Sequence, residues 1–123
     1  MNLPNKITPV TCAIIEQDEK ILCAQRSEKM KHPLKWEFPG GKIEKTESPG
    51  SCLQREIKEE LGVEIEILEQ LPTSKHTYPG NIIISLLPFR CKITSGKITL
   101  AEHKQIKWLS LEELRIWIGW RRI

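Results

Sequence analysis

The sequence predicts an α/β domain in which helices cover a mixed β-sheet. Three observations predict it: β-branched runs joined by short polar turns, one strongly marked helix near the middle of the chain, and strand-like runs on both sides of that helix. Short turns join antiparallel strands, whereas longer crossovers join parallel ones. Because both kinds of connection occur in one chain, we expect a mixed sheet rather than a purely parallel one.

The length of 123 residues indicates one domain, which we assign to residues 1–123, since a domain takes roughly 100–200 residues. The net charge of +3 is too small to argue for nucleic-acid binding. No apolar run approaches the roughly 20 residues that cross a bilayer, and the N-terminus lacks the pattern of a signal peptide. We therefore expect a cytoplasmic protein that binds neither nucleic acid nor membrane; the sequence leaves monomer and dimer open.

The N-terminal third predicts a hairpin, then a loop, then a glycine turn. Residues 10–15 are rich in β-branched side chains, and residues 20–26 form a second strand-like run after a polar break. Two such runs across a short polar turn are typical of a hairpin. Residues 27–35 are polar and contain a proline, so we expect a loop that leads to the Pro-Gly-Gly turn at residues 39–41.

Residues 48–62 carry the clearest helix signal. Ser48 suits the N-cap, Pro49 suits the first helical position, and Gly62 suits the position just after the last turn. Apolar residues recur at every fourth position and form one stripe for burial: Leu53, Ile57 and Leu61.

The rest of the chain predicts further strands and a last helix. Residues 63–71 alternate apolar and acidic side chains, as in a strand with one solvent-exposed face. Ser110 and Glu113 form a capping-box pattern, which predicts the start of a helix. The other strand-like runs are residues 74–78, 82–92 and 106–109.

The four cysteines form no Cys-x-x-Cys pair, so we do not expect a zinc site. Two of them lie inside apolar runs. We expect buried free thiols in a reducing compartment. The cysteines are Cys12, Cys23, Cys52 and Cys91.

Three glutamates of the central helix, Glu56, Glu59 and Glu60, stand three and four positions apart. This spacing places them within one arc of about 100°. Like charges so placed destabilise a helix by a few tenths of a kcal/mol per pair, so a positive partner is expected. Mg²⁺, a hard cation that bridges carboxylates to substrate phosphates, suits that role. The glutamates alone leave another interpretation open: a solvated acidic face balanced by Arg55 and Lys58.

The surrounding residues favour the metal. Residues 41–63 fill every defining position of the pattern G-x5-E-x7-R-E-U-x-E-E-x-G-U, where U is aliphatic. A chance match is on the order of 10⁻⁸ per start point. This is the Nudix box, and the chain resembles Nudix hydrolases, in particular the MutT-like nucleoside triphosphate pyrophosphohydrolases. The resemblance extends to residues 36–44, Trp-Glu-Phe-Pro-Gly-Gly-Lys-Ile-Glu, and to Ala-Glu at residues 101–102 before Trp-Leu-Ser at residues 108–110.

The resemblance implies the Nudix fold, an α/β/α sandwich around a mixed β-sheet. It also implies attack of water on a phosphorus of a nucleotide, with a nucleoside monophosphate and pyrophosphate as the products in MutT-like members. The implied cofactor is Mg²⁺, with Mn²⁺ as an alternative ion. The metals would neutralise the phosphates and lower the pKa of the attacking water.

The resemblance also assigns roles to single residues. Glu56, Glu59 and Glu60 are the implied metal ligands, with Glu60 the most central, and the carbonyl of Gly40 supplies a further oxygen. Glu102 matches a carboxylate that binds metal or activates water; its alternative is a surface carboxylate.

Arg55 is implied to lie beneath the glutamates and to pair with Glu47, so that it orients the carboxylates. We count Arg55 and the glutamates as the catalytic group of residues.

The candidates for substrate binding are two cations and two aromatic residues. Lys42 and Arg26 match family positions near the phosphates, and their alternative is a solvated surface position. Phe38 and Tyr78 are candidates to stack on the base, with core or loop packing as the alternative. We expect His103, like His76, to be a satisfied or surface histidine.

The leading substrate is an oxidised purine triphosphate such as 8-oxo-dGTP, whose removal sanitises the nucleotide pool and supports DNA repair. CTP or a modified pyrimidine triphosphate is the near alternative, and ADP-ribose or a dinucleoside polyphosphate is a more distant one. A rival of another class is a catalytically weak nucleotide-binding module on the same scaffold.

The C-terminal residues 116–123 depart from the family, because they contain no Asn or Asp to read the base edge. Two explanations stay open: a native ending, or a truncation by a slip of the reading frame. Permissible codons shifted by one base encode Asp-Leu-Asp-Trp-Val-Glu-Ala-Asp, which resembles the continuation of MutT relatives. Sequencing the source gene past its stop codon would separate the two.

Overall fold

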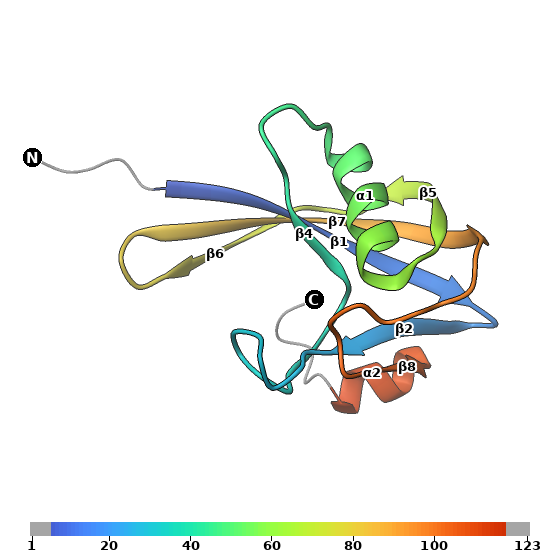
Figure 1. Ribbon diagram of the computed structural model, residues 1–123. Coiled ribbons are helices and arrows are strands. Elements are labelled where there is room, and N and C mark those ends of the chain that lie inside the picture. Colours follow the sequence, from blue (N-terminus) through green and yellow to red (C-terminus); the bar gives the residue numbers. More distant parts are fainter. Residues whose placement is uncertain (1–5, 118–123) are drawn as a thin grey trace, which may run out of the picture.

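The computed structural model describes residues 6–117, which form eight strands and two helices (Figure 1). The strands are β1 (Lys6–Gln17), β2 (Lys20–Gln25), β3 (Trp36–Glu37), β4 (Gly40–Lys42), β5 (Glu64–Gln70), β6 (Ser74–Tyr78), β7 (Ile82–Ser95) and β8 (Gln105–Leu109). The helices are α1 (Pro49–Leu61) and α2 (Leu111–Trp117). No helix in this part of the chain is long and apolar enough to cross a membrane.

The two longest strands, β1 and β7, form the centre of the sheet and pair in parallel. Their register runs from Lys6 opposite Ile82 to Ile15 opposite Cys91. The other strand pairs are antiparallel, and the main order is β3-β2-β1-β7-β5. The predicted mixed sheet is therefore confirmed. β1 and β7 also extend beyond the predicted runs. Residues 6–9 of β1 pair with β7, and residues 93–95 of β7 pair with β5, so their backbone groups are satisfied.

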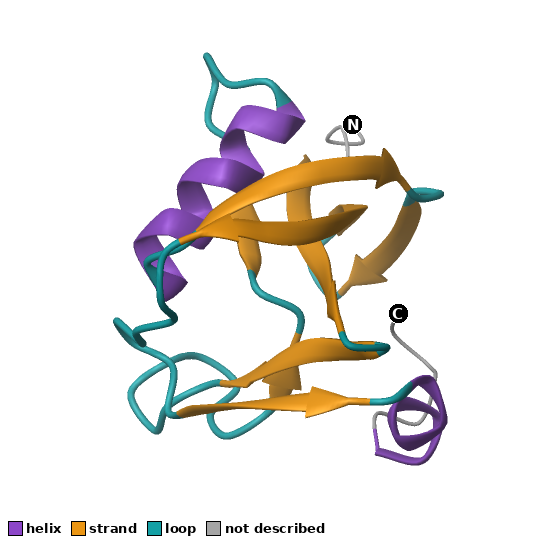
Figure 2. Cartoon of the chain, turned by 90° about the vertical axis from the view of Figure 1, so that its right-hand side faces the viewer, coloured by secondary structure: helices purple, strands orange, loops and turns teal. Residues whose placement is uncertain are grey.

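β1 also connects two groups of strands. Residues 6–15 pair with β7 and residues 10–12 also pair with β4, whereas the last two residues pair with β2 across the predicted hairpin. β2 continues the second group by pairing with β3 and β8. Figure 2 shows the two groups one above the other, with α1 and α2 on opposite sides of the strands.

Helix α1 forms as its end signals predict. The Ser48 hydroxyl accepts a hydrogen bond from the Ser51 N–H at 3.2 Å, which caps the first turn. Gly62 ends the helix with φ of 71°, and its N–H donates to the Lys58 carbonyl at 3.0 Å. The predicted apolar stripe is fully buried against the sheet: Leu53, Ile57 and Leu61.

Two apolar clusters form the core. The larger lies between α1 and the strands β1, β5 and β7, and the smaller lies between β1, β2, β8 and α2. All four cysteines are buried free thiols, as predicted. Burial raises the pKa of Cys12 and of Cys91 to about 12, so both stay protonated.

The capping box at the start of α2 is confirmed. The Ser110 N–H donates to the Glu113 carboxylate at 2.9 Å, and the Glu113 N–H donates to the Ser110 hydroxyl at 3.1 Å. Residues 118–123 lie outside the described residues, so the hypothesis of a reading-frame slip in residues 116–123 stays a prediction.

We predict that Gly62→Ala lowers the free energy of unfolding more than Gly80→Ala does. Both glycines have positive φ, where an L-residue costs about 1–2 kcal/mol. At Gly62 the new Cβ would also lie 2.6 Å from the Thr99 hydroxyl, whereas at Gly80 it would meet nothing within 4 Å. Urea denaturation of both variants measures the difference. Thr99→Ala should remove that excess, and equal losses at the two glycines would contradict the steric explanation.

Candidate active site

The candidate site lies where α1 packs against β4. The two strands β1 and β4 approach so closely that a Cβ on Gly40 would overlap the Thr11 carbonyl. A Cβ on Gly41 would overlap the carboxylate of Glu56. The glycine pair of the Pro-Gly-Gly turn therefore lets a backbone strand lie directly against the acidic face of the helix.

The three predicted glutamates share this face but differ in exposure. The side chains of Glu56 and Glu60 are 21% and 18% exposed, and that of Glu59 is 54% exposed. The first two are thus partly desolvated beside β4, whereas Glu59 lies at the solvent edge. Partial burial makes the charge of Glu56 and Glu60 sensitive to whatever ion stands next to them.

Arg55 organises the outer side of the cluster. Its guanidinium donates to Glu47 at 2.9 Å through Nη2, and Nη1 donates to Glu56 and to Glu59, each at 2.9 Å. The predicted pair of Arg55 and Glu47 is confirmed. The hydrogen bond from Arg55 lowers the pKa of Glu47 to about 2. One planar cation therefore fixes three carboxylates of the Nudix box at once.

Among residues 6–117, no lysine or arginine forms an ion pair with Glu60. Burial raises its pKa to about 9, and the neighbouring carboxylate of Glu56 and the charge of Glu37 add to the effect. A backbone hydrogen bond with Gly40 opposes the rise only in part. The charges of Glu56 and Glu37 thus act on Glu60 in a partly desolvated space, with an excess of negative charge when all three are ionised.

The donor set fits a hard divalent cation. Among residues 6–117, no three acidic, histidine or cysteine side chains converge as a complete metal site. Mg²⁺ rarely needs a complete site of protein side chains, because it binds through one or two carboxylates and completes its coordination shell with water and phosphate oxygens. Glu56, Glu60 and the Gly40 carbonyl supply oxygen donors of this kind beside an excess of negative charge.

The structure adds two residues that the sequence analysis did not select, Glu37 and His103. Glu37 lies on β3, and His103 precedes β8, 66 positions further along the chain. The His103 Nε2 lies 2.8 Å from Glu37 Oε2, and Nδ1 lies 3.7 Å from Glu60 Oε1. We expected His103 to be a surface histidine or one with its hydrogen bonds satisfied. This expectation is wrong in one respect, because the buried Nδ1 atom of His103 has no hydrogen-bond partner. One feature of the sequence could have indicated His103 as a site residue: it directly follows Glu102, in the segment that resembles the family.

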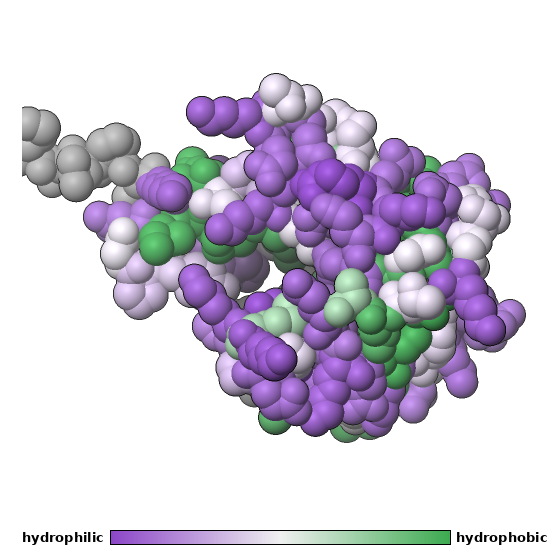
Figure 3. Space-filling model, in the orientation of Figure 1, coloured by the Kyte–Doolittle hydropathy of each residue, from purple (hydrophilic) through white to green (hydrophobic). Residues whose placement is uncertain are grey.

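A cavity of about 390 Å³ opens beside the glutamates, and it gathers three of the predicted substrate-binding residues. Arg26, Phe38 and Lys42 all line it, together with Gly40 and Gly41. It therefore combines two cations with two aromatic residues, Trp36 and Phe38, and with the carboxylate of Glu37. Hydrophilic residues dominate the face that carries α1, and this face is hollowed between the two groups of strands (Figure 3).

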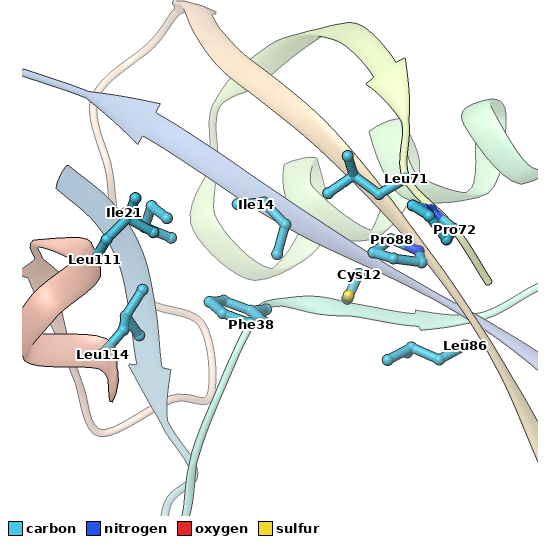
Figure 4. A pocket seen from close by; sticks show the side chains of 10 residues that line it. All are labelled: Cys12, Ile14, Ile21, Phe38, Leu71, Pro72, Leu86, Pro88, Leu111 and Leu114. Atoms are coloured by element: carbon cyan, nitrogen blue, oxygen red, sulfur yellow. The ribbon is translucent and has the colours of Figure 1, made fainter. Parts of the chain in front are cut away.

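A second cavity, of about 410 Å³, is almost wholly apolar and shares Cys12, Phe38 and Leu86 with the first. Figure 4 shows it between β1 and α2, with Phe38 pointing into the space from the segment before β4 and Leu114 from the helix. The two cavities adjoin at Phe38, and we call them together the recess: the first carries the charged side chains, and the second is lined almost wholly by apolar ones.

The structure does not bring the other two predicted residues to this recess. Glu102 is exposed and lines a separate cavity with Glu28 and Met30. Tyr78 lies at the far end of β6, opposite Ile82, and is 48% exposed. The roles predicted for Glu102 and Tyr78 therefore stay predictions.

Comparisons with known proteins identify the class. A family model described as NUDIX domain matches residues 6–122. The chain is 39% identical over 108 residues to the CTP pyrophosphohydrolase of Escherichia coli K12, which covers 88% of this chain and 79% of that protein. It is 38% identical over 92 residues to the 8-oxo-dGTP diphosphatase of Proteus vulgaris, which covers 74% of this chain and 79% of that protein.

Among solved structures, the MutT protein of methicillin-resistant Staphylococcus aureus 252 matches with 47% identity and a TM-score of 0.72, over 90% of this chain and 85% of that one. The chain therefore belongs to the Nudix family. It is a Nudix hydrolase, an enzyme that acts on acid anhydrides, and members of this family generally use divalent metal ions.

We predict that Glu60→Gln stabilises the metal-free protein at alkaline pH. Because the folded state raises the pKa of Glu60 to about 9 from an ordinary value of 4.5, it binds the proton more tightly than the unfolded chain does. The stability that this group contributes is full below pH 4.5 and is lost as the pH rises towards 9. Thermal melts in EDTA from pH 5 to pH 9 should show a growing advantage of the variant. The exposed Glu112, changed to Gln, is the control, and parallel curves for wild type and Glu60→Gln would contradict the prediction.

Proposed function

We propose that the chain hydrolyses nucleoside triphosphates to nucleoside monophosphate and pyrophosphate with the help of Mg²⁺. The observation that carries the proposal is the uncompensated carboxyl group of Glu60, which faces Glu56 beside a cavity lined by Arg26 and Lys42. A polyphosphate brings several negative charges to this place, and the lysine and arginine attract them. The carboxylates would repel the same charges unless a divalent cation stood between.

The residues that would hold Mg²⁺ are Glu56, Glu60 and the Gly40 carbonyl, with Glu59 and Glu102 as further candidates from the family pattern. A divalent ion held there neutralises phosphate charge and lowers the pKa of the attacking water. Arg55 keeps the carboxylates in place through its hydrogen bonds to Glu56 and Glu59.

The recess supports a nucleotide as the substrate. Its first cavity carries Arg26 and Lys42, which suits phosphates, and its second, apolar cavity adjoins at Phe38, which suits a base. Our first candidate is an oxidised purine triphosphate such as 8-oxo-dGTP, removed from the nucleotide pool. The second candidate is CTP or a modified pyrimidine triphosphate, favoured by the longer match to the CTP pyrophosphohydrolase. The four buried free thiols are consistent with action in the cytoplasm.

A panel of substrates tests this function. We expect one of 8-oxo-dGTP, dGTP, CTP and 5-methyl-dCTP to release pyrophosphate with Mg²⁺, and ADP-ribose to be a poor substrate. Glu60→Gln should lower kcat/KM by more than roughly 100-fold, because loss of a ligand exceeds the 10–100-fold cost of losing an outer partner. Glu112→Gln should leave turnover unchanged. Nucleotide binding without turnover in excess Mg²⁺ would contradict the enzyme and favour a binding module.

We predict that Phe38→Leu raises the KM for the preferred nucleotide by roughly 10-fold, since base stacking contributes about 1–3 kcal/mol. Leucine keeps an apolar side chain at this partly buried position but removes the ring. Tyr78→Leu is the matched change of an aromatic residue outside the recess, and its KM should stay at the wild-type value. Steady-state kinetics on both variants measure the two KM values. A larger increase in KM for Tyr78→Leu would contradict the prediction and indicate that Tyr78 stacks on the base.

A further inference from the structure

His103 is a buried histidine between two carboxylates of the site. Its side chain is only 2% exposed. The Nε2 atom lies 2.8 Å from Glu37 Oε2, within hydrogen-bond distance. The Nδ1 atom lies 3.7 Å from Glu60 Oε1, just outside it, and is the one buried side-chain polar atom without a partner among the described residues.

The Nε2 side of the ring is firmly anchored. Glu37 also accepts a hydrogen bond from Arg26 at 2.9 Å. Burial alone would favour the neutral acid, but the hydrogen bonds from His103 and Arg26 lower the pKa of Glu37 overall. An ionised carboxylate held from two sides is a fixed acceptor, so the orientation of the imidazole ring is fixed as well.

The Nδ1 side of the ring points to Glu60. A buried polar nitrogen without a partner is rare in proteins, because it loses its bonds to water and gains none in return. Glu60 Oε1 is the carboxylate oxygen next to it, and a small movement of this side chain would complete the hydrogen bond.

We propose that His103 is a positioning residue for Glu60: with a proton on each ring nitrogen, it donates to Glu37 through Nε2 and to one oxygen of the Glu60 carboxylate through Nδ1, and it leaves the other oxygen for the metal. The inference rests on the proposed function, in which Glu60 is a metal ligand. Carboxylate ligands of metals are commonly held by such outer hydrogen bonds. His103 itself would touch neither metal nor substrate.

Two amide variants separate the two ring nitrogens. In His103→Gln the amide nitrogen falls near the position of Nε2, whereas in His103→Asn it falls near the position of Nδ1. We expect His103→Gln to keep the melting temperature but to bind Mn²⁺ roughly 10–100-fold more weakly. We expect His103→Asn to lose melting temperature but to bind Mn²⁺ almost as wild type does. Electron paramagnetic resonance of free Mn²⁺, titrated without nucleotide, measures the affinity.

The matched control is His76→Gln, since His76 contacts Ser74 on β6 and lies outside the carboxylate cluster. Its Mn²⁺ affinity should equal that of wild type. In turnover assays His103→Gln should lower kcat and leave the nucleotide KM unchanged. If Mn²⁺ affinity and melting temperature fall together in both His103 variants, or if neither variant changes the affinity, the positioning role is overturned.

Nitrogen resonances of the wild-type histidine rings provide a readout that needs no stable His103 variant. Saturating Mg²⁺ should shift the Nδ1 resonance of His103 and leave those of His32 and His76 in place. An unchanged Nδ1 resonance would overturn the proposal.

The two proposals fail in different ways. If Mn²⁺ binds in a manner that depends on Glu60 and His103 but no triphosphate is hydrolysed, the proposed function fails and the positioning role stands. If triphosphates are hydrolysed with full dependence on Glu60 while His103→Gln is silent in kcat and in metal affinity, the reverse holds.

Discussion

The site depends on one constraint: carboxyl groups are brought together where little water remains to separate their charges. Helix α1 must bury its apolar stripe against the sheet, and this burial turns the adjoining glutamates towards β4. The strand can come so close only because Gly40 and Gly41 lack side chains. The free energy of burying Leu53, Ile57 and Leu61 therefore stabilises an arrangement that is electrostatically unfavourable in itself.

The carboxylates around this place are compensated unequally. Glu56 is paired with Arg55 at 2.9 Å, and Glu37 is paired with Arg26 at 2.9 Å. Each arginine thus forms an ion pair with one carboxylate, and these ion pairs hold Glu56 and Glu37 in fixed positions. Glu60 lies between them, and in the described part of the chain its nearest basic atom is the unbonded His103 Nδ1 at 3.7 Å. The missing positive charge is thus confined to one position.

The sequence predicted those features that neighbouring residues determine. The caps of α1, its buried stripe, the hairpin and the pair of Arg55 with Glu47 all lie within short stretches whose residues act on one another directly. The contact of Glu37 with His103 joins residues 66 positions apart, and only the folded sheet brings them together. Tyr78 illustrates the same limit: an aromatic residue next to a turn suggests a base contact, but the pairing of β6 with β7 carries it to the far end of the sheet.

The unequal compensation also explains why the glutamates of one motif need not act alike. Glu59, at the solvent edge, is screened by water and held by Arg55, so an added cation gains little by binding to it alone. Glu60, partly desolvated and lacking a paired cation, gains most from a divalent ion, because charge interactions strengthen as water is excluded. In the proposed function, phosphates would approach the same ion from the cavity that Lys42 lines. The site would then bind the metal and the polyphosphate more tightly together than singly, since the metal supplies positive charge and the polyphosphate supplies negative charge.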